Sequence, residues 1–431
     1  MAKNLNILVI GSGGREHALV WALSKTQAKG INLFCAPGNA GIAEIAECVP
    51  LSANEIPALA RFAEEKSIDL TFVGGESPLA AGIVDDFEAR GLMIIGPRRD
   101  AARLESSKGF AKDFMTRHQI PTAAYRVSGS AAEAKAVLNS GEFGAESSAV
   151  VVKADGLAAG KGVVVAFSRA EAEKAIDDSM LGNTVGSDAA RLVVIEEALT
   201  GPEVSLLLFS DGRDFVLMPP ARDHKRIGEN DTGPNTGGMG AITDQSVIGA
   251  DMLERIVTEV VEPTLEGAIS EGFAFRGVLF IGLMLTDDGP RVLEYNVRFG
   301  DPEAQAILVR LQSPLIEILE AIGRRQLSSV KPQWSAGSSA CVVLAAPGYP
   351  EHPETGALIE GLERAAAREY VQTFHAGTSR TASGNWVTAG GRVLGITSAG
   401  DTLAQALSRC YEAAGDVHWD GIQYRRDIGK Q

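Results

Sequence analysis

Short apolar runs alternate with helix-length segments through the first hundred residues, and this alternation restricts the fold more than any other feature. The apolar runs occupy residues 5–10, 31–36, 70–73 and 92–95. Helical patterns lie between them, at residues 15–24, 58–66 and 78–90. Parallel strands need long crossover connections, usually helices, whereas antiparallel hairpins do not. We therefore expect residues 1–103 to form a parallel α/β domain with helices on both faces of its sheet.

The rest of the chain carries two further patterns, so that its 431 residues predict three domains at roughly 150 residues each. Residues 104–330 are expected to form the second domain, with β-branched runs and glycine-rich loops marking a small subdomain at about 122–193. A helical pattern over 250–271 precedes two apolar runs, 277–286 and 291–295, which we expect to form a central antiparallel pair. Residues 331–431 are expected to form a separate α+β cap.

The composition excludes several classes of partner. Forty Lys and Arg residues stand against 55 Asp and Glu, a net charge of −15 that repels nucleic acid and anionic membranes. The longest apolar run, 278–285, is far shorter than the ~18 residues of a membrane span. The four cysteines, 35, 48, 341 and 410, form no metal-binding spacing and are expected to be free thiols. We therefore expect a cytoplasmic protein that works on small molecules without nucleic acid or membrane.

A glycine turn follows the first apolar run, at Gly11-Ser12-Gly13-Gly14-Arg15-Glu16. Backbone N–H groups at the start of a helix can bind an anion, so the turn is a candidate phosphate site. A dinucleotide-binding fingerprint would place a glycine where Glu16 stands, and an acidic residue where Cys35-Ala36-Pro37-Gly38 ends the second run. Nicotinamide cofactors are therefore disfavoured. The alternative is a tight strand-to-helix turn that needs small residues only for packing.

A second glycine loop lies between two β-branched runs, at residues 150–165. It is no Walker A motif, because three residues separate Gly156 from Gly160, and a glycine and a strand follow Lys161. We interpret it as a mobile lid whose lysines meet phosphate oxygens. A surface hairpin would explain Lys161 but not Lys153, which ends an apolar run where an unpaired ammonium group is costly.

Carboxylates and one guanidinium follow the later apolar runs. Glu196 and Glu197 end one run and Glu203 begins the next, where a strand end can meet adenine and a carboxylate can meet ribose hydroxyls; solvated acids at a turn are the alternative. Farther on, Glu294, Asn296 and Arg298 alternate along one strand and so share a face. Two oxygen ligands beside a guanidinium are suited to a Mg²⁺–phosphate centre.

The order of these motifs resembles that of the ATP-grasp ligases. Within that superfamily, the octapeptide at 298–305 and the segments 11–18, 234–240 and 425–429 resemble the phosphoribosylamine–glycine ligases, or glycinamide ribonucleotide synthetases. The resemblance extends over essentially the whole chain. It implies an N-terminal parallel α/β (pre-ATP-grasp) domain, an ATP-grasp core with a small lid subdomain, and a C-terminal α+β cap.

The resemblance also implies an activity and a set of residues. ATP, glycine and 5-phosphoribosylamine would give glycinamide ribonucleotide, ADP and phosphate through a glycyl phosphate, in de novo purine biosynthesis, with Mg²⁺ or Mn²⁺ as cofactor and a monomeric enzyme. Glu294 and Asn296 would hold the metal, and Arg298 and Asp301 would be catalytic, with Arg298 holding the acyl phosphate. The ATP site would be formed by Lys108, Lys153, Gly160, Lys161, Glu196, Glu197, Ala198, Leu199 and Glu203.

Phosphoribosylamine is expected on the N-terminal glycine turn and on neighbouring loops that end at the same edge of the sheet. Which residues meet phosphate and which meet ribose stays open, and for His224 and Lys225 a solvated turn is an equal alternative. The expected residues are Gly13, Gly14, Arg15, Glu16, Asn39, Glu76, Asp223, Lys225, Pro234, Asn235, Thr236, Gly237 and Gly238.

Three other functions compete with this interpretation. Another ATP-grasp carboxylate–amine ligase of nucleotide metabolism is the nearest, and the octapeptide at 298–305 argues against it. A non-catalytic ATP-binding module should have lost its lysines and metal ligands, which are all present. A nicotinamide dehydrogenase would need an acidic residue for the ribose at the end of the second apolar run, and the chain lacks one there.

Overall fold

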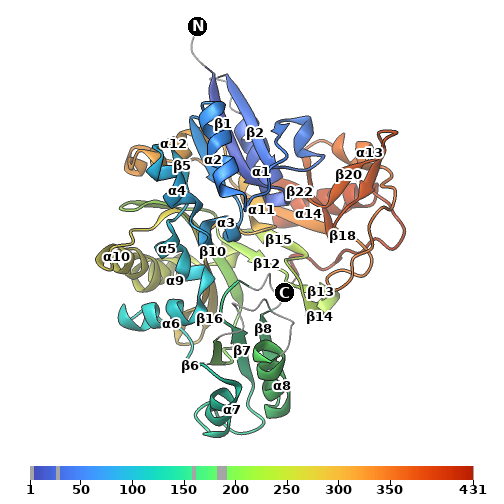
Figure 1. Ribbon diagram of the computed structural model, residues 1–431. Helices are drawn as coiled ribbons and strands as arrows, with labels where there is room; N and C mark the ends of the chain where they lie inside the picture. The colour runs from blue at the N-terminus through green and yellow to red at the C-terminus, as the bar shows by residue number, and fades with distance from the viewer. Residues whose placement is uncertain (1–3, 26–29, 158–161, 182–191, 431) are drawn as a thin grey trace.

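The computed structural model describes residues 4–25, 30–157, 162–181 and 192–430. In Figure 1 the N-terminal domain lies at the top, the lid subdomain at the bottom and the C-terminal segment at the right of the central sheet. Among the described residues, no helix is long and apolar enough to cross a membrane. The four cysteines are free, with Cys35, Cys341 and Cys410 buried and Cys48 half-buried, as predicted.

The N-terminal domain is the predicted parallel α/β unit. Its five strands lie in the order β3-β2-β1-β4-β5, and all neighbouring pairs are parallel. The strands are β1 Leu5–Gly11, β2 Ile31–Pro37, β3 Glu47–Cys48, β4 Leu70–Val73 and β5 Ile94–Ile95, and the helices are α1 Gly14–Ser24, α2 Ile56–Glu65, α3 Glu76–Ala80 and α4 Ile83–Ala89. The helix predicted over 78–90 is divided at Gly82, whose φ of +88° and close approach to Arg99 exclude a side chain.

The lid subdomain has a sheet and an apolar core of its own. Its four antiparallel strands lie in the order β6-β9-β7-β8. They are β6 Tyr125–Ser128, β7 Val150–Ala154, β8 Val163–Ala166 and β9 Val193–Glu197, covered by α7 Ala131–Asn139 and α8 Arg169–Met180. Val150, Val152, Ile176 and Ile195 form the centre of the core. The predicted helix over 169–179 is therefore confirmed.

The second domain is built on a nine-stranded sheet, in the order β17-β16-β10-β12-β15-β18-β22-β19 with β11 beside β10. The predicted antiparallel pair is β16 (Arg276–Thr286) and β17 (Gly289–Asn296), but it lies at one end of the sheet and not at its centre. Pro290 in β17 has no N–H for a further ladder, which an edge strand tolerates. Residues 121–122 cover part of this edge, since Val292 N–H donates to the Pro121 carbonyl at 2.8 Å.

The C-terminal strands continue this same sheet and do not form one of their own. The open edge of β15 (Gly240–Thr243) pairs with β18 (Ser338–Ala345), which pairs with β22 (Arg392–Gly400), and β19 (Val371–His375) closes the sheet. A sequence pattern shows where a strand lies but not which strand it pairs with. The sequence therefore could not distinguish the expected separate C-terminal cap from an extension of the central sheet. α14 (Leu403–Ala414) and α13 (Leu362–Ala366) cover these strands, and β20 (Thr378–Arg380) and β21 (Trp386–Thr388) form a small hairpin.

The remaining elements surround the cleft described below. The predicted helix over 250–271 runs from α9 (Ala250–Ile256) through a π-helical turn (Val257–Val261) into α10 (Glu262–Ser270). The other helices are α5 Arg99–Ser106, α6 Lys108–Arg117, α11 Glu303–Leu308 and α12 Leu315–Gly323. The other strands are β10 Glu203–Asp211, β11 Phe215–Leu217, β12 Ala221–Asp223, β13 Arg226–Gly228 and β14 Thr232–Asn235.

Candidate active site

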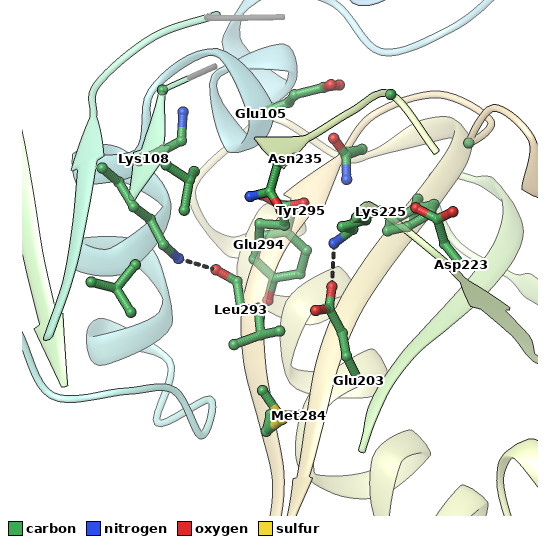
Figure 2. Close-up of a pocket in the computed structure, with 18 of the residues that line it drawn as sticks. Glu105, Lys108, Glu203, Asp223, Lys225, Asn235, Met284, Leu293, Glu294 and Tyr295 are labelled. Carbon is green, nitrogen blue, oxygen red and sulfur yellow. Dashed lines mark hydrogen bonds and ion pairs between the residues drawn. The ribbon is translucent and has the colours of Figure 1, made fainter. Parts of the chain in front are cut away.

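A cleft of about 1050 Å³ lies where the three parts of the chain meet. The N-terminal domain contributes Arg15 and Glu76, the lid Lys153, the central sheet Glu294, and the C-terminal strands Arg392. Figure 2 shows Lys225 and Glu203 directed toward each other, with Lys108 and Glu294 among the other lining residues. The structure therefore brings together residues that are more than four hundred positions apart in the sequence, such as Arg15 and Lys430. Such a concave, charged site is the expected place for a polar substrate.

Three lysines gather on the lid side of the cleft. Lys108 at the start of α6 donates to the Gly156 carbonyl at 2.9 Å, and Lys153 at the end of β7 donates to the Leu293 carbonyl at 3.0 Å. Lys112, which the sequence analysis missed, follows Lys108 by one helical turn and lies 2.9 Å from Glu196. That i, i+4 spacing could have indicated it. Burial lowers the pKa of Lys108, and it lowers the pKa of Lys112 to about 8 although Glu196 opposes the change.

The carboxylate of Glu196 is occupied by these lysines. Its two oxygens lie 2.9 Å from Lys112 Nζ and 2.9 Å from Lys153 Nζ, and the side chain is buried. Glu197 accepts a hydrogen bond from the Ala124 N–H at 2.8 Å. Ala198 and Leu199, the next residues, line the cleft. In this arrangement the carboxylate of Glu196 organises the lysines, while the following backbone is available to a ligand.

Glu203 and Lys225 form an ion pair across the cleft floor (Figure 2). Burial lowers the pKa of Lys225, but Glu203, Glu294 and Asp223 outweigh burial and raise it above its ordinary value. Lys225 is therefore positively charged at neutral pH and well above it. A ligand that uses Glu203 must share this carboxylate with Lys225.

Glu294 and Asn296 at the end of β17 have the chemistry of a divalent metal site. Burial raises the pKa of Glu294, but Lys225, Lys153 and Lys108 outweigh it and keep the group ionised. Carboxylate and amide oxygens are the hard ligands that Mg²⁺ prefers. Among the described residues, no group of three or more acidic, histidine or cysteine side chains could hold a metal. A Mg²⁺ ion here would therefore take its other ligands from phosphate oxygens and water, as Mg²⁺ usually does.

Arg298 lies just after the end of β17, not on the strand as the sequence predicts, and it links Asn296 to the N-terminal domain. Its guanidinium donates to Asn296 Oδ1 at 3.0 Å and lies 2.8 Å from Glu105 Oε1 and 3.3 Å from Glu76 Oε2. Glu105 in α5 was missed, because an acid near a helix end resembles any solvated residue in sequence. It is buried, and burial raises its pKa although Arg298 opposes the change.

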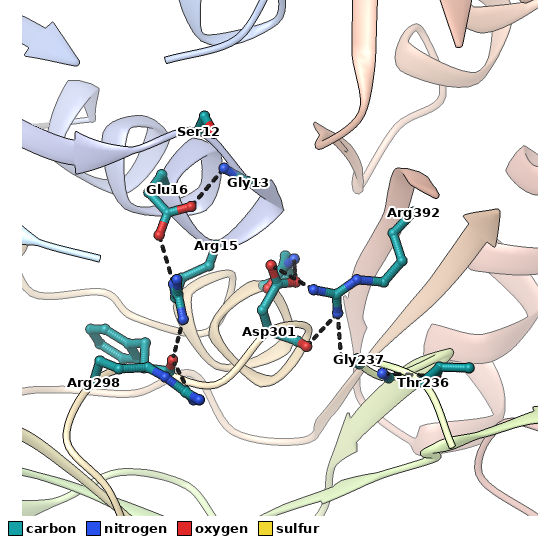
Figure 3. A network of polar contacts seen from close by, with 12 residues as sticks. Ser12, Gly13, Arg15, Glu16, Thr236, Gly237, Arg298, Asp301 and Arg392 are labelled. Atoms are coloured by element: carbon teal, nitrogen blue, oxygen red, sulfur yellow. Dashed lines mark hydrogen bonds and ion pairs between the residues drawn. The ribbon is translucent and has the colours of Figure 1, made fainter. Parts of the chain in front are cut away.

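The N-terminal glycine turn already holds a carboxylate, that of its own Glu16 (Figure 3). Glu16 accepts from the Gly13 N–H at 2.6 Å and from Arg15 Nε at 2.7 Å. Arg15 also donates to the Phe299 carbonyl at 3.0 Å, and of the turn residues it alone appears in the lining of the described cleft. A side chain on Gly14 would come within 2.6 Å of Gln305 Nε2, so this glycine serves close packing.

Asn39 lies outside the lining of the cleft and is used by the backbone. Its amide donates to the carbonyls of Ser12 at 2.8 Å and His375 at 2.9 Å, and its oxygen accepts from Gly41 and Ile42. Because both ends of the amide have partners, Asn39 holds the glycine turn against β19. Asn39 therefore supports the glycine turn without lining the cleft.

Asp301 and Arg392 form a second junction, between the core and the C-terminal strands (Figure 3). Arg392 in β22 lies 3.2 Å from Asp301 Oδ2 and donates to the carbonyls of Asp301 and Gly237, each at 2.5 Å. Arg392 and Arg15 hold the pKa of Asp301 below its usual range, although burial raises it. No local sequence pattern could have indicated Arg392, because its partners lie in other parts of the chain.

The loop from Asp223 to Gly238 forms one wall of the cleft. Asp223, Lys225, Asn235, Thr236 and Gly237 line it, whereas Pro234 and Gly238 are absent from the described lining. Gly238 has a φ of +107°, and a side chain there would meet Pro302 at 2.5 Å. Its role is therefore close approach to the Asp301-Pro302 segment.

Asp223 and the buried Glu303 share one end of this wall. Burial raises the pKa of both carboxyl groups, and Glu303 raises that of Asp223 further. Gly160 and Lys161, two of the predicted ATP-binding residues, lie outside the described residues.

Comparisons with known proteins all indicate the same family for this chain. The phosphoribosylglycinamide synthetase family matches the chain in three parts, its N domain at residues 5–105, its ATP-grasp (A) domain at 106–304 and its C domain at 339–431. The phosphoribosylamine–glycine ligase of Vibrio cholerae is 47% identical over 430 residues, covering 99% of this chain and 98% of the relative. That of Mesorhizobium japonicum is 46% identical over 427 residues, covering 99% and 98%.

Solved structures extend the agreement to the fold. The crystal structure of phosphoribosylamine–glycine ligase from Thermotoga maritima has a TM-score of 0.84 and 35% identity, covering 99% of this chain and all of that one. The biotin carboxylase domain of the Hydrogenobacter thermophilus 2-oxoglutarate carboxylase has a TM-score of 0.74 at 14% identity, covering 98% and 92%, which shows a shared fold. The predicted architecture of N-terminal domain, ATP-grasp core and C-terminal domain is thereby confirmed, and the chain belongs to the phosphoribosylglycinamide synthetase family.

Proposed function

We propose that the chain is an ATP-dependent ligase that joins glycine to 5-phosphoribosylamine, in de novo purine biosynthesis. The products are glycinamide ribonucleotide, ADP and phosphate. One observation carries the proposal: a single cleft gathers a lysine cluster, an ionised Glu294 beside Asn296, and the Arg298 and Arg15 guanidinium groups. Phosphoryl transfer to a carboxylate needs alignment and charge neutralisation more than a protein nucleophile, and this cleft supplies both.

The reaction has two displacements. A glycine carboxylate oxygen attacks the γ-phosphorus of ATP, and the bond from that phosphorus to the leaving ADP oxygen breaks, which leaves glycyl phosphate. The amine of phosphoribosylamine then attacks the glycyl carbon, the carbon–oxygen bond to phosphate breaks, and the nitrogen loses a proton. Arg298 is proposed to hold the acyl phosphate through both steps, with Asp301 held beside it by Arg392.

ATP is proposed to lie between the lid and the central sheet. Lys108 and Lys153, with Gly160 and Lys161 of the glycine loop, would meet the phosphates. The backbone of Ala198 and Leu199 would meet adenine beside Glu196 and Glu197, and Glu203 would accept from the ribose hydroxyls while keeping Lys225. Two buried, lysine-paired oxygens make the Glu196 carboxylate better suited to positioning these lysines than to direct contact with the base.

Mg²⁺, or Mn²⁺ in its place, is proposed to bind at Glu294 and Asn296. When bound, the ion neutralises phosphate charge and orients the phosphate oxygens. Arg298 keeps Asn296 in place by donating to its side-chain oxygen.

Glycine is proposed to place its ammonium group beside Asp223 and Glu303. Asp223 Oδ1 is closed to solvent and has no hydrogen-bond partner among the described residues. A buried carboxylate of this kind is costly unless a donor meets it, and an ammonium group offers three N–H donors.

Phosphoribosylamine is proposed to occupy the side of the cleft formed by Arg15, Glu76 and the wall from Asp223 to Gly237. Gly13, Gly14, Glu16, Asn39 and Gly238 would support that side through the contacts described above, and Pro234 would support it as part of β14. We further propose that the chain acts as a cytoplasmic monomer without nucleic acid or membrane, in keeping with its net charge of −15.

ADP release tests the proposal. The enzyme is given Mg²⁺ and ATP, with glycine and freshly made phosphoribosylamine added separately and then together. Turnover only with both, and glycinamide ribonucleotide in the mass spectrum, is the expected result. Turnover with a different amine or carboxylate, and none with this pair, would overturn the substrate assignment while keeping the ATP-grasp chemistry.

A further inference from the structure

The segment Arg425–Lys430, called here the terminal strap, lies across the β13–β14 hairpin of the cleft wall. Figure 1 shows the C-terminus beside β13 and β14, near the middle of the molecule. The proposed chemistry gives this segment no role. Its contacts nevertheless connect it to several residues that line the cleft.

The Arg425 side chain makes several of the strap's contacts. It is only 2% exposed, and its guanidinium makes four hydrogen bonds. It donates to Asp427 Oδ1 and Oδ2, each at 2.8 Å, to Asp231 Oδ1 at 2.6 Å and to the Arg226 carbonyl at 3.1 Å. Two of these four contacts are to the hairpin, one to Arg226 in β13 and one to Asp231 in the turn. A planar fork of donors makes such a fixed arrangement possible for arginine and not for lysine.

Three further contacts tie the strap to the same wall. The Asn230 N–H donates to Asp427 at 2.8 Å, and the Arg426 N–H donates to Glu229 at 3.2 Å. The Gly429 N–H donates to His224 Nε2 at 3.0 Å, for which the imidazole must be neutral. Burial, together with Arg425 and Arg222, lowers the pKa of His224 to about 4, so the acceptor is present at neutral pH.

The other face of the strap is fixed to the C-terminal domain. The Tyr411 hydroxyl in α14 donates to the Arg425 carbonyl at 3.0 Å and accepts from the Ile428 N–H at 3.1 Å. Ile428 itself is buried in the core of that domain. The strap therefore joins a well-packed body to the hairpin.

The hairpin depends on such support. β13 and β14 have three and four residues and pair only with each other among the described strands, and an isolated hairpin is marginally stable in water. Its turn holds Asn230 and Asp231 at φ of 55° and 51°, an unfavourable conformation. Yet Arg226, Asp231 and Asn235 of this hairpin line the cleft, as does Lys430 of the strap.

We infer that the terminal strap positions the β13–β14 hairpin for binding of phosphoribosylamine, with Arg425 as a positioning residue that acts through Asp231 and Arg226. The charges at this end of the cleft, Lys225, Arg226 and Lys430, suit the phosphate of a sugar phosphate. The inference rests on the proposed function. The ATP phosphates are proposed to lie on the lysine cluster at the lid side, to which none of the strap contacts described above extends.

Arg425→Met tests the inference in the full-length chain. The KM for phosphoribosylamine should rise about tenfold, while kcat at saturation and the KM for ATP change less than about threefold. Hydrogen exchange of residues 226–235 should accelerate in the free enzyme, and that of the lid strands should stay the same. Arg425→Lys should resemble the methionine variant, because an ammonium group cannot replace the fork.

Arg368→Met is the matched control. Arg368 pairs with Asp416 at 2.5 Å in the same domain, away from the cleft lining. This variant should leave both KM values unchanged. Asp231→Asn provides a second route if Arg425→Met fails to fold, since the Asp231 side chain is 67% exposed and its loss is tolerable.

The effects of Arg425→Met and Asp231→Asn on KM should be non-additive, since both break one contact. A lower Tm for Arg425→Met without any change in KM or in exchange of the hairpin would make the strap merely structural and would overturn the inference. Independent effects of the two substitutions would overturn it as well. If the unaltered enzyme shows no turnover with glycine and phosphoribosylamine, the proposed function fails instead, and the exchange experiment alone decides the strap's role.

Discussion

The lid and the opposite wall of the cleft are built in different ways. The lid has an apolar core of its own and places Lys153 through one local hairpin, β7 with β8. The opposite wall joins Arg15, Asp301 and Arg392, which come from three parts of the chain, through carbonyls and ion pairs. The difference shows that one side of the cleft is a local unit with its own core, whereas the opposite wall depends on contacts between distant parts of the chain.

Arg298→Ala should have the largest effect, because Arg298 stands where the two sides meet. Synthesis should fall by about 10³-fold or more, with ATP affinity within about threefold, since the guanidinium acts on the transferred group. Steady-state kinetics and nucleotide titration measure the two quantities. Weaker ATP binding with turnover unchanged at saturating ATP would instead place Arg298 on the nucleotide side of the cleft.

Lys112→Met tests the lysine cluster on the lid side. Lys112 and Glu196 are a buried pair, and removal of Lys112 leaves Lys153 as the remaining cation on the Glu196 carboxylate, so the free energy of unfolding should fall by about 2 kcal/mol. Urea unfolding monitored by circular dichroism measures this loss. The variant Glu196→Gln should cost more stability than Lys112→Met, because it removes the carboxylate partner of both Lys112 and Lys153. A smaller loss for Glu196→Gln than for Lys112→Met would show that this carboxylate does not hold the two lysines together.

Acid should weaken the opposite wall first. His17 in α1 accepts from the His375 N–H at 2.8 Å, and burial lowers the pKa of His17 to about 4 and that of His375 to about 3. Because the unfolded chain binds these protons near pH 6.5, stability is complete above that pH and is lost as pH falls toward 4. His17 alone should cost about 2 kcal/mol at pH 5 relative to pH 7.

Urea unfolding at pH 7 and pH 5 tests this loss. His17→Gln should flatten the pH dependence, whereas His352→Gln, a change at an exposed histidine, should leave it unaltered. If the free energy of unfolding changes equally between pH 7 and pH 5 for the wild type and His17→Gln, His17 is excluded as the source of the pH dependence.

Arg392→Met should give a smaller effect confined to the same wall. Loss of its contacts to Asp301 and Gly237 should raise the KM for phosphoribosylamine by about tenfold, roughly 1.4 kcal/mol. The KM for ATP should stay within about twofold if the two sides are independent. Coupled changes in both KM values would show that the wall and the lid are one cooperative unit.

Much of this arrangement was predictable because the evidence for it is local. The parallel N-terminal domain follows from alternating segment lengths, and Glu294 and Asn296 share a face because strands have a period of two. Lys153 stood out because an ammonium group at the end of an apolar run needs a partner. The predicted pairing of residues 277–286 with 291–295 was also correct, since a short connection favours a hairpin.

The sequence alone therefore predicted the parallel N-terminal domain, the antiparallel pair of β16 and β17, and the family to which the chain belongs. The tertiary structure decided the rest: that β17 lies at a sheet edge, that the C-terminal strands extend the central sheet, and that Glu105, Lys112 and Arg392 are parts of the site. The physical reason is the distance along the chain over which each effect acts. Periodicity and turn chemistry act over a few residues, whereas strand neighbours and buried ion pairs depend on which distant surfaces exclude water together.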